Sequence, residues 1–182
     1  VFSGKTTGTP ICIIVPNENQ RSKYYEYGIA RPAHADFSAN QKYHGFEDYR
    51  GGGHFSGRVT AGIVAGGAIL QKALQDIGVT VATHISECAE LHDKAFDDIK
   101  NDRLTLDCAK FPVLDEDVAS GMIKAIEQAK ADGDSVGGIV ETAISGIPSG
   151  VGEPWFDSVE SVLSHALFSI GGVKGVEFGD GF

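Results

Sequence analysis

Hydrophobic residues recur at helical spacing in two segments of the chain. In residues 115–131 and 157–170 they stand three or four positions apart, which places them on one face of a helix. Asp115 begins the first segment and Asp157 the second, and a carboxylate at that position caps backbone N–H groups. Glu160, three residues after Asp157, completes a capping box. We therefore predict two amphipathic helices over these residues.

A third helix is predicted by a different pattern. From Ser56 or Gly57 to about Asp76, the first three turns are almost entirely apolar or small, and polar residues appear only near the end. A helix without a polar face is buried on all sides, and its glycines permit close contact between backbones. Gly78 follows as the expected C-terminal cap.

Segments rich in β-branched residues predict four strands, at residues 9–16, 79–86, 135–147 and 173–178. Residues 17–57 show little periodicity, and a loop-rich stretch of that length inside a domain is usually functional. Residues 87–114 are mixed, with a short helix expected at 93–100. This order of elements favours an α+β fold, with one sheet packed on helices, in a single domain over residues 1–182.

Composition and charge exclude several classes of function. Apolar residues make up 42% and charged residues 22%, as in a globular chain, and no apolar run is long enough to predict a membrane span. The net charge of −10 argues against a nucleic-acid or anionic-membrane partner. Cys12, Cys88 and Cys108 match no disulfide or metal-site spacing. We expect a cytoplasmic protein without a metal.

Both ends of the chain suggest a larger protein. Val1 takes the place of an initiator Met, no signal peptide follows it, and the last residues, 176–182, read as a strand and turn with nothing after them. We therefore expect a chain that is truncated at both ends.

Arginine residues gather in the first third of the chain. Residues 1–60 hold 7 of the 15 Lys and Arg but 5 of the 25 Asp and Glu, and four of the five Arg lie within residues 21–58. Arg binds phosphate or carboxylate oxygens in pairs through its planar fork. This distribution predicts an anion site, while scattered surface ion pairs are the alternative interpretation.

The glycine-rich stretch at residues 49–58 is the first candidate for that site. Three glycines lead into a polar turn and then into the apolar helix, so the backbone can approach a ligand closely and N–H groups at the helix start favour an anion. Arg50 and Arg58 flank it, and His54 and Ser56 add hydrogen-bonding groups. The alternative is a flexible connecting loop. A dinucleotide-binding fold is disfavoured, because the G-x-G-x-x-G spacing is absent.

Residues 31–36 (RPAHAD) are the second candidate. Arg31 is a candidate anion ligand, and His34 lies between small residues, where an imidazole can move a proton near neutral pH. Asp36 is close enough in sequence to orient that ring, although its position at i+2 does not require it to do so. A structural histidine is the alternative interpretation. Four further histidines show no catalytic context, namely His44, His84, His92 and His165.

Five stretches together resemble the chorismate synthase family. RPAHAD is similar to the family's RPGHAD, and YRGGGHFSGRVTA to its glycine-rich block. Further along, SGIPSGVGEPWFDSVES and SIGGVKGVEFGDGF are similar to its GxPxGLGEPxFDxxDA and SINAVKGVEIGDGF, and TTGTPICIIVPNENQRSKYY matches its TTGTPI segment. The five occur in the family's order and cover essentially the whole chain.

The resemblance implies a fold and an activity. The fold would be the β-α-β sandwich core of the chorismate synthase type. The activity would be a 1,4-anti elimination of phosphate from 5-enolpyruvylshikimate 3-phosphate, giving chorismate with reduced FMN and no net redox change. An external reductant would supply the reduced flavin, and the full-length protein would form a homotetramer.

The resemblance also implies roles for residues. His34 matches the family's catalytic histidine, and Arg58 and Arg31 would bind the substrate's anionic groups. The FMN contacts would come from the glycine-rich block and from the later glycine pair, namely His54, Phe55, Ser56, Gly171 and Gly172.

Some positions depart from the family pattern. Ala33 replaces a glycine, Gly171 replaces an asparagine, and His54 and Phe55 replace the commoner Arg-Ser. The family's GESHG segment, with a second catalytic histidine, and its C-terminal part are absent from these residues. We therefore expect the chain alone to be inactive. A non-catalytic FMN- or phosphate-binding module and, less favoured, an NAD-type oxidoreductase are the alternatives.

Overall fold

A computed structural model describes residues 1–18 and 21–181. Asn19, Gln20 and Phe182, which belong to two of the motifs above, lie outside the described residues. The chain forms two compact units, one from Val1–Ile69 with the residues from Gly152 onward and the other from Leu70–Val151. The single domain over residues 1–182 stays a prediction.

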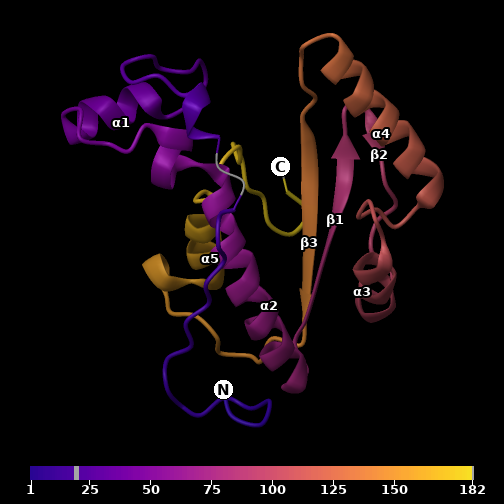
Figure 1. The fold of residues 1–182 in the computed structure, drawn as a ribbon. Helices are drawn as coiled ribbons and strands as arrows, with labels where there is room; N and C mark the ends of the chain where they lie inside the picture. Colours follow the sequence, from indigo (N-terminus) through magenta and orange to yellow (C-terminus); the bar gives the residue numbers. More distant parts are fainter. Residues whose placement is uncertain (19–20, 182) are drawn as a thin grey trace. The chain divides into compact units, whose positions relative to one another are not determined.

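The unit Leu70–Val151 is built on an antiparallel sheet (Figure 1). Strand β1 (Thr80–Cys88) lies between β2 (Leu91–His92) and β3 (Gly138–Ser145). The β1–β3 pairing runs from Thr80 opposite Ser145 to Cys88 opposite Gly138, with a shift of register between Ile85 and Glu87. The strands predicted at 79–86 and 135–147 are therefore confirmed, with slightly different ends.

Helices α3 (Ile99–Cys108) and α4 (Glu116–Ala131) supply the partners for the buried side chains of β1. Ala82 packs with Leu106 and Leu114 in one cluster, and Cys88 packs with Val113 and Met122 in another. These clusters form because the apolar positions of each element recur on one face. The sheet packed on helices confirms the predicted α+β fold within this unit.

The predicted helix at 115–131 is confirmed, whereas the one at 93–100 is wrong. Asp115 accepts a hydrogen bond from the N–H of Asp117 at 3.0 Å and so caps α4. Helix α3 begins at Ile99 instead, because Asp98 caps it by accepting from the N–H groups of Lys100 and Asn101 at 3.0 and 3.3 Å.

The other unit holds short helices joined by loops. They are η1 (Ser22–Tyr24), α1 (Asp36–Tyr43), η2 (Arg50–Phe55), η3 (Gly57–Val59), η4 (Trp155–Asp157) and α5 (Val159–Leu167). Helix α5 starts later than predicted, since Ser158 rather than Asp157 caps it by accepting from the N–H of Ser161 at 3.2 Å. Helix α1 falls within the stretch predicted to be loop-rich.

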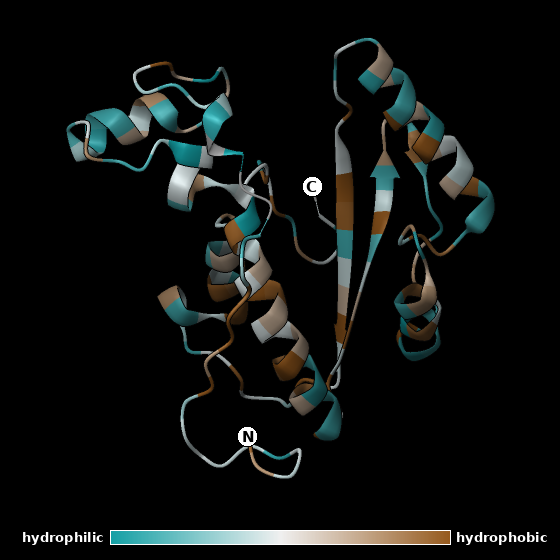
Figure 2. Ribbon diagram, viewed as in Figure 1, coloured by the Kyte–Doolittle hydropathy of each residue, from teal (hydrophilic) through white to brown (hydrophobic). Residues whose placement is uncertain are grey.

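Helix α2 (Thr60–Asp76) has the predicted position but not the predicted environment. It crosses from one unit into the other, and Gly78 follows it with a φ of 89°, as a C-terminal cap requires. Hydrophobic segments recur along it (Figure 2). Yet Ile63 and Val64 are each 69% exposed, and no residue of α2 is buried within the described part of the chain. The prediction of burial on all sides is therefore wrong for this chain.

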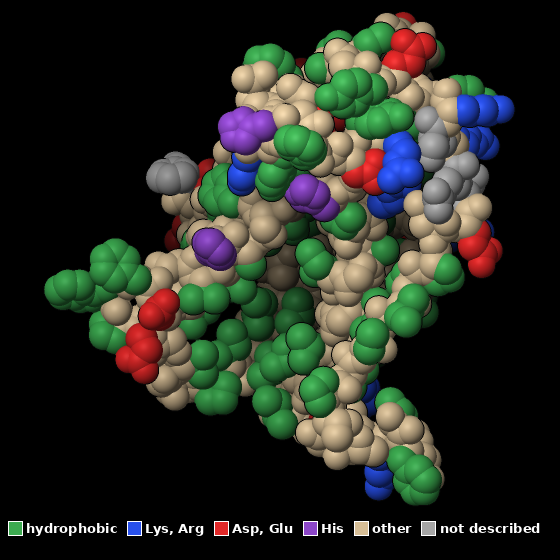
Figure 3. Space-filling model, turned by 60° about the vertical axis from the view of Figure 1, so that its left-hand side comes forward, with side chains coloured by type: hydrophobic (Ala, Val, Ile, Leu, Met, Phe, Trp, Pro, Cys, Tyr) green, Lys and Arg blue, Asp and Glu red, His purple; other side chains and the backbone are tan. Residues whose placement is uncertain are grey.

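Two predicted strands are also wrong. Residues 9–16 and 173–178 form no strand in the structure. The preference of β-branched residues for strands takes effect only when a neighbouring strand accepts their backbone hydrogen bonds. Among residues 1–18 and 21–181, neither segment pairs with such a neighbour. Hydrophobic side chains gather on part of the face seen in Figure 3, and Ile14 of the first segment is 82% exposed.

Candidate active site

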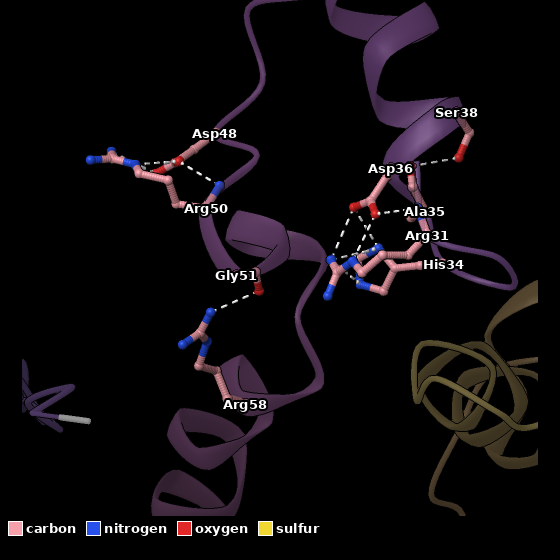
Figure 4. A network of polar contacts seen from close by, with 9 residues as sticks. All are labelled: Arg31, His34, Ala35, Asp36, Ser38, Asp48, Arg50, Gly51 and Arg58. Atoms are coloured by element: carbon pink, nitrogen blue, oxygen red, sulfur yellow. Dashed lines mark hydrogen bonds and ion pairs between the residues drawn. The ribbon is translucent and has the colours of Figure 1, made fainter. Parts of the chain in front are cut away.

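His34 lies in a polar cluster just before α1 (Figure 4). Asp36, the first residue of that helix, accepts from the Arg31 side chain at both oxygens, with Nε 2.8 Å from Oδ2 and Nη2 3.0 Å from Oδ1. The backbone N–H of Arg31 also donates to Oδ2 at 3.0 Å, and Nδ1 of His34 lies 2.7 Å from Oδ1. The sequence left this contact between Asp36 and His34 open, and the structure forms it.

The charges in this cluster are complementary. The Arg31 guanidinium, through its hydrogen bonds, holds the pKa of the Asp36 carboxyl well below its usual range, against a smaller opposing effect of burial. Asp36 in turn raises the pKa of Arg31. Asp36 is therefore a carboxylate throughout the physiological range and can only accept hydrogen bonds.

Arg31 also covers one face of the His34 ring. Its Nη2 lies 3.1 Å from Nδ1 and 3.2 Å from Nε2. An atom that close to both nitrogens must lie above the ring, because within the ring plane it would overlap Cε1. The lone-pair direction of Nε2, which lies in that plane, is not used by Arg31. The guanidinium further stacks near the Tyr25 ring, 5.1 Å from its centroid.

The glycine run brings the second motif to His34. Gly51, Gly52 and Gly53 have φ values of 66°, 81° and 51°, a left-handed conformation that side chains rarely tolerate. Gly52 is buried, and a Cβ there would lie 2.8 Å from Cε1 of His34 and 2.9 Å from Nη2 of Arg31. The two motifs that the sequence singled out separately are therefore in direct contact.

The arginines beside the glycine run contact the chain itself. Nη2 of Arg58 donates to the Gly51 carbonyl at 2.7 Å, as Figure 4 shows. Arg50 donates to both oxygens of Asp48, at 2.8 and 3.0 Å, and these hydrogen bonds lower the pKa of Asp48. Among residues 1–18 and 21–181, no hydrogen bond engages Nε or Nη1 of Arg58, whereas Arg50 directs its fork at a carboxylate.

The helix start offers fewer free N–H groups than the sequence suggested. The N–H of Arg58 donates to Ser56 Oγ at 3.4 Å, that of Val59 to the Ser56 carbonyl at 3.2 Å, and that of Thr60 to carbonyls of the preceding turn. These donors are therefore satisfied within the chain. An anion bound here would be held chiefly by side chains.

His54 and Phe55 form an aromatic group with Tyr43. The rings of His54 and Phe55 lie 4.2 Å apart between centroids, and the Tyr43 ring lies 5.6 Å from that of His54 in an edge-to-face arrangement. Such ring faces suit stacking on a flat conjugated ligand.

Gly171 and Gly172 lie in a turn after α5. Gly172 has a φ of 96°, and within the described part of the chain no atom beyond the adjacent residues lies within 4 Å of where a Cβ would stand at either glycine. The backbone there is open to close approach. Among the described residues, no hydrogen bond joins this turn to the cluster around His34.

A second histidine cluster in the unit Leu70–Val151 was missed by the sequence analysis. His84 is buried, with Nδ1 2.7 Å from Oδ2 of Asp93 and Nε2 2.8 Å from Oε2 of Glu141. Asp93 also accepts from the N–H groups of Leu114 and Asp115 at 2.6 and 2.9 Å. The sequence pattern that could have revealed this cluster is the alternation along β1. It places His84 on the buried face, where a polar ring requires hydrogen-bond partners.

Comparison with known proteins identifies the family. The family model described as chorismate synthase matches residues 1–182. A chorismate synthase from Chloroflexus aggregans is 44% identical over 100% of this chain and 49% of its own length, and one from Chitinophaga pinensis is 46% identical over 100% and 47%. The chain thus spans about half the length of these relatives.

A solved structure shows that the fold is shared. A crystal structure of a chorismate synthase superposes with a TM-score of 0.71 over 81% of this chain and 47% of that one, at 24% identity. Together with the match over all 182 residues, this places the chain in the chorismate synthase family.

Proposed function

We propose that the complete protein containing these residues is a chorismate synthase. It would eliminate phosphate from 5-enolpyruvylshikimate 3-phosphate by a 1,4-anti elimination to give chorismate, as a carbon–oxygen lyase. The family assignment supports this, and the observation that carries it in this chain is the contact of His34 with Asp36 at 2.7 Å beside the buried Gly52. A histidine oriented by a carboxylate is an arrangement suited to proton transfer.

The residues present fit reduced FMN as the cofactor. The rings of His54 and Phe55 would contact the flavin with the Ser56 hydroxyl nearby, and the open backbone at Gly171 and Gly172 would admit a flat ring. When bound, reduced FMN supplies an electron transiently to the substrate and recovers it, so the reaction has no net redox change.

The chain's own residues would bind the substrate and move a proton. Arg58 would hold a substrate anion through Nε and Nη1, since its Nη2 is engaged with the Gly51 carbonyl. Arg31 would contribute Nη1, since its Nε and Nη2 face Asp36. Cations placed where the departing phosphate develops charge stabilise the transition state. His34 would hold or transfer a proton at Nε2.

The wider setting follows from the same proposal. The complete protein would be a cytoplasmic homotetramer that receives its reduced flavin from an external reductant. None of the helices formed by residues 1–18 and 21–181 combines the length and apolarity needed to cross a membrane.

Anaerobic turnover tests the proposed function. The complete protein, mixed with reduced FMN and 5-enolpyruvylshikimate 3-phosphate, should release phosphate and chorismate in equal amounts, measured by mass spectrometry. His34→Ala should lower turnover by at least about 10²-fold, the scale for loss of a proton-transfer group. His165→Ala, which removes an exposed imidazole on α5, serves as the matched control and should leave turnover unchanged.

Flavin binding without elimination would instead favour a non-catalytic binding module. In a single-turnover assay, the 182-residue chain alone should form no chorismate, and chorismate formation by it would contradict that expectation.

A further inference from the structure

We infer that Asp36 is a positioning residue, which holds the His34 imidazole in the tautomer that carries its proton on Nδ1 and so leaves Nε2 as the nitrogen that exchanges a proton. The catalytic part of this inference rests on the proposed function. The tautomer itself does not, because it follows from the contacts within the chain.

The first step is the direction of the hydrogen bond. Nδ1 of His34 and Oδ1 of Asp36 lie 2.7 Å apart. Because Asp36 is ionised, it has no proton to donate, so Nδ1 must be the donor. In a neutral imidazole, a proton on Nδ1 leaves Nε2 unprotonated.

The second step is the rigidity of the carboxylate. Oδ2 accepts from the backbone N–H and from Nε of Arg31, at 3.0 and 2.8 Å, and Oδ1 accepts from Nη2 of Arg31 and Nδ1 of His34, at 3.0 and 2.7 Å. Four donors thus occupy the four acceptor positions of one carboxylate. The side chain cannot rotate without breaking a charge-assisted pair, so it defines where the imidazole nitrogen must lie.

The third step is the packing of Gly52 at the Cε1–Nε2 edge of the ring. A Cβ at Gly52 would stand 2.8 Å from Cε1 and 3.0 Å from Nε2 of His34. Glycine therefore leaves the Nε2 edge free of a side chain while its backbone packs against the ring. With Arg31 above the ring, Asp36 at Nδ1 and Gly52 beside Nε2, the ring is held on three sides.

A substitution at Asp36 makes the inference testable. In Asp36→Asn, the amide oxygen is expected to take the place of Oδ2, where two Arg31 donors meet, so that the NH₂ group faces His34 and the hydrogen bond from Nη2 of Arg31 to Oδ1 is lost. Nδ1 would then have to accept, and the ring proton would move to Nε2. The same exchange of tautomer accounts for the loss of rate when an aspartate behind a catalytic histidine becomes asparagine.

Nuclear magnetic resonance of the ¹⁵N-histidine-labelled chain reads the tautomer directly. In the neutral form of the imidazole, the wild-type His34 signal should show the proton on Nδ1. Asp36→Asn should show it on Nε2, and His34→Gln identifies the signal. Asp107→Asn, which breaks an Arg–Asp pair in which Nη2 of Arg103 lies 2.9 Å from Oδ2, is the matched control and should leave the tautomer unchanged.

Turnover of the complete protein measures the effect of the altered tautomer on catalysis. Asp36→Asn should lower kcat by about 10²-fold while the KM for substrate changes by less than about threefold, because the residue acts through His34 and not on the bound substrate. Asp107→Asn should alter neither constant.

The possible outcomes separately test the tautomer of His34, the catalytic role of Asp36 and the proposed function. A wild-type His34 protonated on Nε2, or an unchanged tautomer in Asp36→Asn, would overturn the inference. If Asp36→Asn does not fold by circular dichroism, the wild-type tautomer alone still decides it. Absence of turnover in the wild-type complete protein would reject the proposed function and leave the tautomer result standing. Normal kcat in a folded variant with the altered tautomer would overturn the catalytic role of Asp36.

Discussion

At the residue scale, Ala33 adopts a conformation that suits glycine. Its φ is 57°, within the left-handed region, where a Cβ lies too close to the following carbonyl. Ala33 directly precedes His34, and the turn through Ala33 allows the N–H of His34 to donate to the Arg31 carbonyl at 3.3 Å. The glycine at this place in the similar RPGHAD motif therefore has a conformational reason.

Ala33→Gly should stabilise the chain slightly. It removes left-handed strain of about 1–2 kcal/mol, and the greater flexibility of glycine in the unfolded state offsets about 0.4–1 kcal/mol of that gain. The free energy of unfolding in urea should rise by up to about 1.6 kcal/mol. A decrease would mean that the Ala33 methyl group makes contacts worth more than the strain.

Arg58 provides a second test at this scale. Arg58→Ala should weaken binding of 5-enolpyruvylshikimate 3-phosphate more than binding of FMN, because the proposed function places Arg58 on an anionic group of the substrate. A hydrogen bond to a charged group contributes about 1.5–3 kcal/mol. Calorimetric titration of the complete protein with each ligand separates the two effects. Arg58→Lys retains the charge but not the planar fork and should fall between wild type and Arg58→Ala. A larger effect on FMN binding would indicate that Arg58 binds an anionic group of FMN and not of the substrate.

At the element scale, the cluster around His84 joins three elements. His84 and Glu141 are directly opposite in the β1–β3 ladder, and Asp93 holds the N–H groups of Leu114 and Asp115 at the start of α4. Burial disfavours the charge on Asp93, but hydrogen bonds, chiefly from Leu114 and His84, outweigh it and lower its pKa. The cluster thus acts as a brace between the sheet and the segment that leads into α4.

Asp93→Asn should destabilise this brace by about 3 kcal/mol, because it leaves buried partners without a charge to pair with. Urea denaturation measures the loss, and Asp76→Asn, at the exposed ion pair with Lys72, should change stability by less than about 1 kcal/mol. A loss of stability in Asp93→Asn no larger than that of the control would show that the cluster around His84 does not stabilise the fold.

The lowered pKa of Asp93 also predicts that the stability difference between wild type and Asp93→Asn depends on pH. Because the pKa of Asp93 is lowered on folding, its stabilising effect is complete above the ordinary aspartate pKa of about 3.9 and disappears as the pH falls below it. The difference in stability between wild type and Asp93→Asn should therefore be constant near neutral pH and shrink below pH about 4. A stability difference that grows as the pH falls would contradict a pKa of Asp93 that is lowered on folding.

At the scale of the whole molecule, the hydrophobic core is distributed unevenly. Both clusters of buried apolar residues lie within the unit Leu70–Val151, where they join β1, α3 and α4. In the other unit, Ala39 is a buried apolar residue, but Ile63, Val64 and Phe156 are largely exposed. Local stability follows the number of buried apolar contacts, so the two units should differ in it.

Hydrogen–deuterium exchange of the chain should show that difference. Amides of β1, β3 and α4 should be protected the longest, and those of α1 and the first turns of α2 should exchange at least about tenfold faster, since opening them exposes little buried surface. Mass spectrometry of peptic fragments resolves these segments. Equal protection of α2 and β1 would show that the exposed apolar face of α2 is covered in solution.

The sequence by itself determined the features that depend on near neighbours in the chain. Apolar residues at helical spacing and a capping aspartate placed α4 correctly, and alternation with β-branched residues placed β1 and β3. The five motifs identified the family, because they are read residue by residue. They also marked both His34 and the glycine run, although not their contact.

Only the tertiary structure decided which side chains meet. It paired Asp36 with His34, brought Gly52 against that ring and buried His84 between two carboxylates. It also left the apolar face of α2 exposed and residues 9–16 without a strand to pair with. The physical reason is that a cap or an amphipathic pattern is satisfied by residues a few positions away, whereas burial, strand pairing and ion pairing require partners that the fold alone brings into contact.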